Sequence, residues 1–78
     1  MNLSELQKGE CGIITKVTAA QVLKSRLNSF GITKGATIYV IEQTMSKNTI
    51  EIRLHSTKIA LRINEAKTIE VERSECEI

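Results

Sequence analysis

Two glycines four positions apart, Gly31 and Gly35, enclose Lys34 in a segment that could suggest a phosphate-binding loop. Such loops follow a strand, open a helix and end in Gly-Lys-Ser or Gly-Lys-Thr, so that backbone N–H groups and the lysine reach the phosphates. Here the pattern before Gly31 is helical, and Lys34 precedes its glycine. We therefore interpret Gly31 as a helix end and Gly35 as a turn, two places where positive φ angles favour glycine.

The single histidine, His55, is a second residue with possible chemistry, because histidine serves in acid-base catalysis and in metal binding. It lies at a predicted turn beside Ser56 and Thr57, and nothing near it in the sequence would orient it for catalysis. A metal site that combines it with Glu51 or Glu65 matches no recognised ligand spacing. The sequence thus predicts no catalytic residue, no metal ligands and no cofactor, and so no enzyme.

Two cysteines, Cys11 and Cys76, stand near opposite ends of the chain. Disulfide frameworks and zinc sites use more cysteines at closer spacing, so we expect two ordinary thiols. The first and last strands of small barrels are often neighbours, which leaves proximity of the two open. The start of the sequence, MNLSELQKGE, lacks a basic stretch followed by an apolar one, so no signal peptide is expected. We therefore expect a cytoplasmic protein.

Length and charge favour one small domain. The 78 residues suffice for one core, predicted as a single domain over 1–78 with its main part at about 4–72 and a short acidic tail at 73–78. Residues 1–69 hold ten basic and five acidic side chains, whereas residues 70–78 hold one and four. Aromatic side chains that could stack on bases are nearly absent, so we expect no nucleic acid partner. No apolar run is long enough to insert into a membrane.

A strand is predicted over about residues 10–17, and a helix follows it. Thr18 is expected to cap this helix together with Gln21, and Val17 is expected to pack on Val22. The apolar residues that recur at helical spacing should form its buried face: Ala19, Val22, Leu23, Leu27 and Phe30.

The second half of the chain alternates apolar and polar residues with period two, which is typical of half-buried strands. Strands are predicted near 38–41, 50–54, 59–63 and 67–72, with turns at SKN and HST. Five short strands and one early helix predict a mainly β fold. We expect a small five-stranded Src-homology-3-like β-barrel, with the α-helix between the first and second strands covering one opening.

Some outward-facing side chains are candidates for partner contact. Alternation along TIYVIE places Tyr39 and Ile41 outside the barrel or beneath the helix, and exposed apolar groups there suggest a docking surface. Arg26 and Asn28 on the helix complete the candidate partner-binding set. Five apolar side chains are expected in the core: Leu23, Leu27, Phe30, Ile52 and Leu61.

The order RLNSFGITKGATIYVIE, a hairpin, and then IALRINEAKTIEV resembles the ferrous iron transport protein A (FeoA) family over residues 4–72. The most specific matches are Arg26-Leu27 before Gly31, the Gly31–Gly35 spacing, Ile59-Ala60-Leu61-Arg62, and Glu65-Ala66 leading to Ile69 and Val71. The resemblance implies the same barrel, a cytosolic location and an accessory role without chemistry of its own. That role would be to bind and modulate the membrane ferrous iron transporter FeoB, whose cytosolic part carries a GTPase domain.

An alternative is a metal-responsive or nucleic-acid-binding regulatory module with the same barrel. Domains similar to the FeoA family also end metal-dependent repressors, but those carry a DNA-binding helical domain for which 78 residues leave no room. The sequence also departs from the family in one place. Many members have a Pro/Gly-rich loop between the second and third strands, whereas residues 44–49 read TMSKNT and contain no proline.

Overall fold

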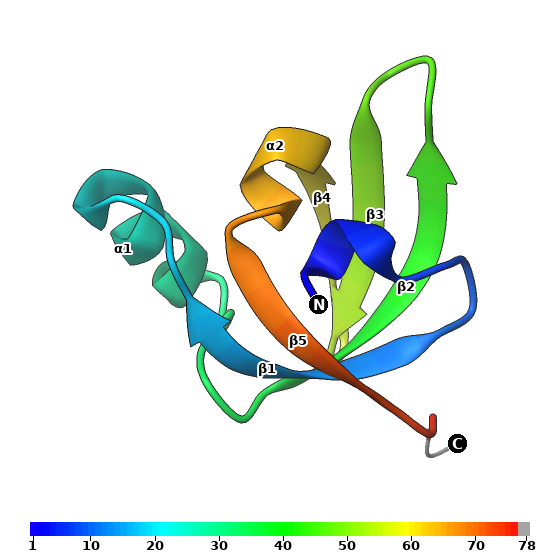
Figure 1. The fold of residues 1–78 in the computed structure, drawn as a ribbon, viewed down its shortest axis with the longest axis horizontal. Coiled ribbons are helices and arrows are strands. Elements are labelled where there is room, and N and C mark those ends of the chain that lie inside the picture. The colour runs from blue at the N-terminus through cyan, green and yellow to red at the C-terminus, as the bar shows by residue number, and fades with distance from the viewer. Residues whose placement is uncertain (77–78) are drawn as a thin grey trace.

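The computed structural model of the chain describes residues 1–76, which form a short 3-10 helix, five strands and two α-helices (Figure 1). In chain order these are η1 (Leu3–Glu5), β1 (Cys11–Val17), α1 (Gln21–Ser29), β2 (Thr37–Thr44), β3 (Thr49–Leu54), β4 (Thr57–Arg62), α2 (Ile63–Ala66) and β5 (Ile69–Ser74).

The five strands form one antiparallel sheet in the order β4-β3-β2-β1-β5. This confirms the predicted mainly β fold with a helix between the first two strands. The first strand pairs with the last, as can happen when a small sheet curls around one core. Among the described strands β4 and β5 are the two edges, and no ladder of hydrogen bonds joins them. The sheet curls in Figure 1, but its edges are not joined as a fully closed barrel would require.

The predicted alternation determines which side chains fill the core. Ile50, Ile52 and Leu54 of β3 are buried, while Arg53 between them is exposed. β2, β4 and β5 each place alternate apolar side chains into the same single cluster. One face of the sheet thus lines the interior, and the other faces outward.

Both predicted hairpin turns are present. His55 at the β3–β4 turn has φ 59°, and Asn48 at the β2–β3 turn has φ 55°. Asparagine and histidine adopt this left-handed region more readily than most residues with a side chain. His55 is exposed at the turn, which accounts for it as a structural residue.

The helix α1 begins later than predicted, at Gln21, and Ala20 at its N-cap makes no side-chain hydrogen bond. Thr18 is not the cap, because its hydroxyl donates to the carbonyl oxygen of Thr68 at 2.9 Å. The expected packing of Val17 on Val22 is also wrong, since Val22 is 86% exposed. The local capping prediction failed because the Thr18 hydroxyl makes a tertiary hydrogen bond instead of capping the helix.

The buried face of α1 is narrower than predicted. Leu27 is fully buried and Leu23 half-buried, but Phe30 at the helix end is 42% exposed. At about 100° per residue, Val22 lies about 140° round the helix from Leu27, on the far side. The prediction that Val22 belongs to the buried face and Phe30 to the core is therefore wrong, whereas Leu27, Ile52 and Leu61 are confirmed as core.

The two glycines have the predicted roles. Gly31 has φ 92° and donates its N–H to the Asn28 carbonyl oxygen at 3.0 Å, while Ile32 N–H donates to that of Leu27 at 3.0 Å. These two bonds define a Schellman helix end. Gly35, also at φ 92°, turns the chain and donates its N–H to the Ile14 carbonyl oxygen at 2.7 Å.

The sequence did not predict two short helices, η1 and α2, which lie on the inner side of the curled sheet between its edge strands β4 and β5. Leu3 and Leu6, in and just after η1, are fully buried, as is Ala66 of α2. The two elements contact each other, and in Figure 1 they lie among the strands while α1 stands to one side. α1 also reaches this core, because Leu27 belongs to the core cluster and Leu23 packs against it. Ile63, predicted to continue the fourth strand, instead begins α2.

Candidate functional site

Arg26, predicted as a partner contact, is engaged within the molecule. Its guanidinium lies 2.7 Å from a carboxylate oxygen of Glu65 on α2. The same carboxylate accepts a hydrogen bond from the backbone N–H of Arg62 at 3.0 Å. Arg26 therefore joins α1 to α2, although 56% of its side chain is exposed.

Asn28 lies on another side of α1, at an open cleft of about 510 Å³ between this helix, β1 and the loop that follows the helix. The cleft, which we call the basic cleft, is lined by Thr15, Lys16, Val17, Lys24, Asn28, Thr33 and Lys34. Within residues 1–76 none of its three lysines has an ion-pair partner. Their charges are therefore available to an acidic group from outside.

Tyr39 and Ile41 of β2 are both half-buried. The guanidinium of Arg53 lies 5.0 Å from the centroid of the Tyr39 ring, within the range of a cation–π contact. Ile41 lies where the register with β3 shifts between Val40 and Glu42, as at a β-bulge. The sequence placed both residues outward without showing this partner for the tyrosine.

The four predicted contact residues thus do not form one surface. Arg26 lies at the α1–α2 contact, Asn28 in the basic cleft, and Tyr39 with Ile41 on β2. Sequence reasoning missed the cleft lysines. The sequence did contain a pattern for part of the cleft lining, because Lys24 and Asn28 are four residues apart and so lie on the same side of a helix. The approach of Lys16 and Lys34 is tertiary and left no local pattern.

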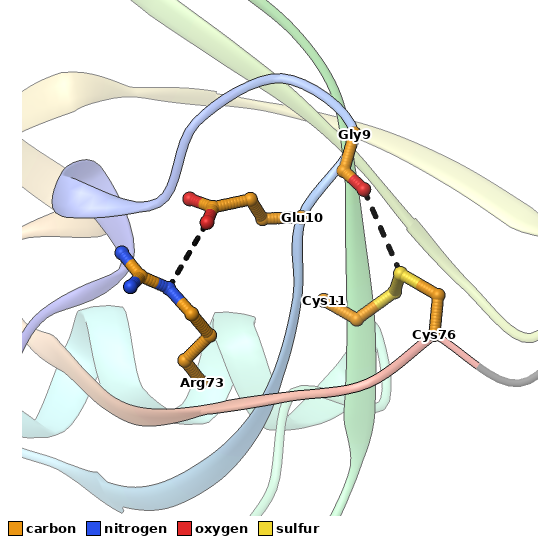
Figure 2. Close-up of a disulfide and its surroundings, with 5 residues drawn as sticks. All are labelled: Gly9, Glu10, Cys11, Arg73 and Cys76. Carbon is orange, nitrogen blue, oxygen red and sulfur yellow. Dashed lines mark hydrogen bonds and ion pairs between the residues drawn. A yellow bond between two sulfur atoms is a disulfide. The ribbon is translucent and has the colours of Figure 1, made fainter.

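The two cysteines are joined by a disulfide, so the expectation of two free thiols is wrong (Figure 2). The β1–β5 ladder explains the pairing, because it places Ser74 opposite Cys11 and brings Cys76 within a Cα–Cα distance of 5.3 Å. Glu10 and Arg73 form an ion pair at 3.0 Å, on the other side of the chain leading into β1 in Figure 2. The start of β1 is thus tied to the end of β5 by two side-chain links.

Glu51 and Glu65, the carboxylates that could have joined His55 in a metal site, have other partners. Glu51 lies 3.1 Å from the ammonium of Lys58, and Glu65 binds Arg26. Residues 1–76 contain no group of three or more His, Cys, Asp or Glu side chains arranged to hold a metal ion. In the same part of the chain, no helix has the length and apolar character needed to cross a membrane.

A curled five-stranded sheet with a basic cleft and a half-exposed aromatic residue on its outer face defines a class: a small Src-homology-3-like β domain with surfaces suited to binding. The family model of the FeoA domain matches residues 1–73. A Campylobacter jejuni protein named Fe²⁺ transport protein A is 41% identical over 71 residues, covering 91% of this chain and 96% of that protein. The chain therefore belongs to the FeoA family of ferrous iron transport proteins.

Other relatives extend the comparison. A Porphyromonas gingivalis fusion of Fe²⁺ transport protein A with the Fe²⁺ transporter FeoB is 32% identical over 72 residues, covering 92% of this chain and 8% of the fusion. The crystal structure of Stenotrophomonas maltophilia FeoA with zinc, described as a prokaryotic SH3 domain protein, matches with TM-score 0.81 and 28% identity over 92% of this chain and 89% of that one. This likeness confirms the predicted Src-homology-3-like fold.

A manganese-dependent transcriptional repressor also contains this fold. It matches with TM-score 0.89 and 19% identity over 94% of this chain and 40% of the repressor. At that identity the likeness concerns the fold alone.

Proposed function

We propose that this protein is a cytoplasmic accessory of ferrous iron uptake that binds and modulates a FeoB-type membrane transporter. The observation that carries the proposal is the Porphyromonas gingivalis fusion, in which a segment similar to 92% of this chain is part of one polypeptide with FeoB. Fusion holds two domains at high effective concentration, which favours contact between them. In separate chains, the same contact has to be made by surface complementarity.

The basic cleft is the surface that we propose for this contact. Lys16, Lys24 and Lys34 offer positive charge without an internal partner among residues 1–76, and Asn28 adds an amide that can donate and accept. Complementary charge raises association rates and suppresses wrong partners. We therefore propose that an acidic segment of the transporter's cytosolic region occupies the cleft.

Tyr39 and Ile41 remain proposed as a second contact, on β2. A tyrosine that is partly exposed and braced by Arg53 is a rigid amphipathic group, of the kind enriched at protein interfaces. Arg26 is proposed only through the exposed part of its side chain, because Glu65 holds its guanidinium.

Modulation follows if the domain binds one state of the transporter more tightly than another. A bound partner shifts a conformational equilibrium only by its difference in affinity for the two states. This role requires no catalytic step from the chain. The likeness to the manganese-dependent repressor concerns the fold alone and so gives no support to the regulatory alternative.

The test is a binding measurement between this protein and the cytosolic region of the FeoB of the same organism. We expect Lys24→Glu to weaken the complex and its salt dependence, because one of the attractive charges is reversed. Lys67→Glu is the matched control, since it makes the same change at an exposed position outside the cleft. Equal binding by both variants would remove the cleft from the proposal, and absence of any complex for the wild type would remove the proposal itself.

A further inference from the structure

We infer that Cys11–Cys76 is a reversible thiol–disulfide exchange site, at which a thiol reductant attacks the sulfur of Cys76, and that reduction uncovers the outer sheet face beside Tyr39. The inference rests on the proposed cytoplasmic location, because disulfides in that compartment are usually transient or redox-sensing. It adds regulation by the redox state of the two cysteines, which the proposed binding to the transporter does not itself include.

The register of the sheet places the disulfide on the outer face. Cys11 lies opposite Tyr39 on β2 and opposite Ser74 on β5. Residues directly opposite one another in an antiparallel pair project to the same face. The next residue, Gly12, faces the interior, since a Cβ there would lie 2.9 Å from Leu6. Cys11, Tyr39 and Ser74 therefore form a row on the outer face, which we call the outer row.

The outer row is covered rather than open at the disulfide. Cys11 is only 5% exposed even though its side chain points away from the core. The hydroxyl of Ser74 is buried and has no hydrogen-bond partner within the described residues. A buried hydroxyl without a partner is unfavourable relative to a hydrated one. Cys76 follows Ser74 by two residues, and its bond to Cys11 holds it beside this row.

Access decides which sulfur a reductant attacks. Cys76 is half-buried, whereas Cys11 is almost wholly buried, so an incoming thiolate reaches Cys76 first. The thiolate forms a mixed disulfide with the Cys76 sulfur, the Cys11–Cys76 bond breaks, and its electron pair leaves on the Cys11 sulfur, which takes up a proton. A second thiol then displaces Cys76, so the reductant leaves as a disulfide and the protein gains two electrons and two protons.

The reduced protein keeps its sheet. The β1–β5 ladder runs from Cys11 opposite Ser74 to Val17 opposite Ile69 and needs no disulfide. The Glu10–Arg73 ion pair at 3.0 Å also remains (Figure 2). The Cys76 sulfur lies 3.6 Å from the Gly9 carbonyl oxygen, and once reduced its thiol can donate only a weak hydrogen bond there. Reduction therefore frees Cys76 from β1 and leaves the strands in place.

The first experiment uses the wild-type protein in glutathione buffers of increasing reduced fraction, with acid quenching and mass spectrometry. We expect the disulfide to open and close reversibly without denaturant, with an unchanged far-ultraviolet circular dichroism spectrum and with the glutathione adduct on Cys76. An adduct on Cys11, or reduction only in denaturant, would overturn the inference.

The second experiment measures the uncovering. Tyr39 is the only tyrosine and the chain has no tryptophan, so tyrosine fluorescence reports on the outer row alone. We expect the acrylamide quenching constant to rise on reduction. Cys76→Ala should show the higher value with or without reductant, which controls for effects of the reductant itself. An unchanged constant in the reduced wild type would overturn the uncovering. Neither experiment contains FeoB, so their failure is distinct from failure of the proposed function.

Discussion

At Gly31 two separate constraints meet on one residue. Its φ of 92° lies in a region that side chains disfavour, and a Cβ built there would lie 2.8 Å from the Cδ2 atom of Leu54. Leu54 is 2% exposed, so it has little room to move. Gly35 shares the φ of 92°, but a Cβ there would meet nothing within 4 Å. Substitution at Gly35 therefore tests backbone strain alone, whereas substitution at Gly31 tests backbone strain together with steric overlap.

We expect Gly35→Ala to lower the free energy of unfolding by about 1–2 kcal/mol, the cost of the left-handed conformation for a residue with a Cβ. Gly31→Ala should lose this and a further ~1–3 kcal/mol, because the core around Leu54 must shift. Urea unfolding of both variants followed by circular dichroism measures the difference. Equal losses would mean that Leu54 adjusts freely and that only the backbone matters at Gly31.

Single residues also show where local prediction stops. Thr18 has the sequence context of a helix cap, but its hydroxyl donates to the Thr68 carbonyl oxygen, fifty residues away in the chain. Arg26 was correctly placed on the helix surface, yet the sequence could not show that Glu65 holds it. The disulfide was missed for the same reason, since its cysteines are 65 positions apart. Each case depends on a partner that only the fold supplies.

At the scale of elements, the strands were predictable and the small helices were not. Period-two alternation predicted β3 to within one residue and the buried positions Ile59 and Leu61 of β4, because one face of each strand is buried and the other is solvated. β4 begins at Thr57, two residues before the predicted start, and ends before Ile63. β5 runs to Ser74, two residues beyond its predicted end, and so includes the start of the acidic segment. η1 and α2 have three and four residues, too few for a helical period to be visible. Their buried leucine and alanine side chains nevertheless complete the core.

We expect leucine-to-alanine substitutions to show how much the segment after η1 and the helix α1 each contribute to the stability of the core. Leu6→Ala removes a fully buried side chain and should lower the free energy of unfolding by about 2–5 kcal/mol. Leu23→Ala makes the same change on α1, where the side chain is only half-buried, and should cause a smaller loss. Thermal and urea unfolding of the pair provide the comparison. A larger loss at Leu23 would mean that α1, rather than the segment after η1, secures the core.

At the scale of the whole molecule, the first residues of the chain are bound to the last strand, β5. The Val71 N–H donates to the Met1 carbonyl oxygen at 2.8 Å, and Asn2 forms an isolated bridge with Glu70. The β1–β5 ladder, the Glu10–Arg73 pair and the disulfide continue this contact. Much of the structure therefore depends on contacts between segments that are distant in sequence. Bringing such segments together on folding costs conformational entropy.

The disulfide should accordingly stabilise the fold chiefly by restricting the unfolded chain. It joins residues separated by 65 positions, and the loop-entropy relation gives about 4 kcal/mol for a loop of this length. We expect the free energy of unfolding to fall by about that amount in the double variant Cys11→Ala, Cys76→Ala, measured with urea, while the native spectrum is kept. The wild type in reductant should show a similar loss, whereas the double variant should not respond to reductant. A far smaller loss would indicate that the unfolded chain already keeps its ends together, since residual structure reduces the entropy that a cross-link can remove.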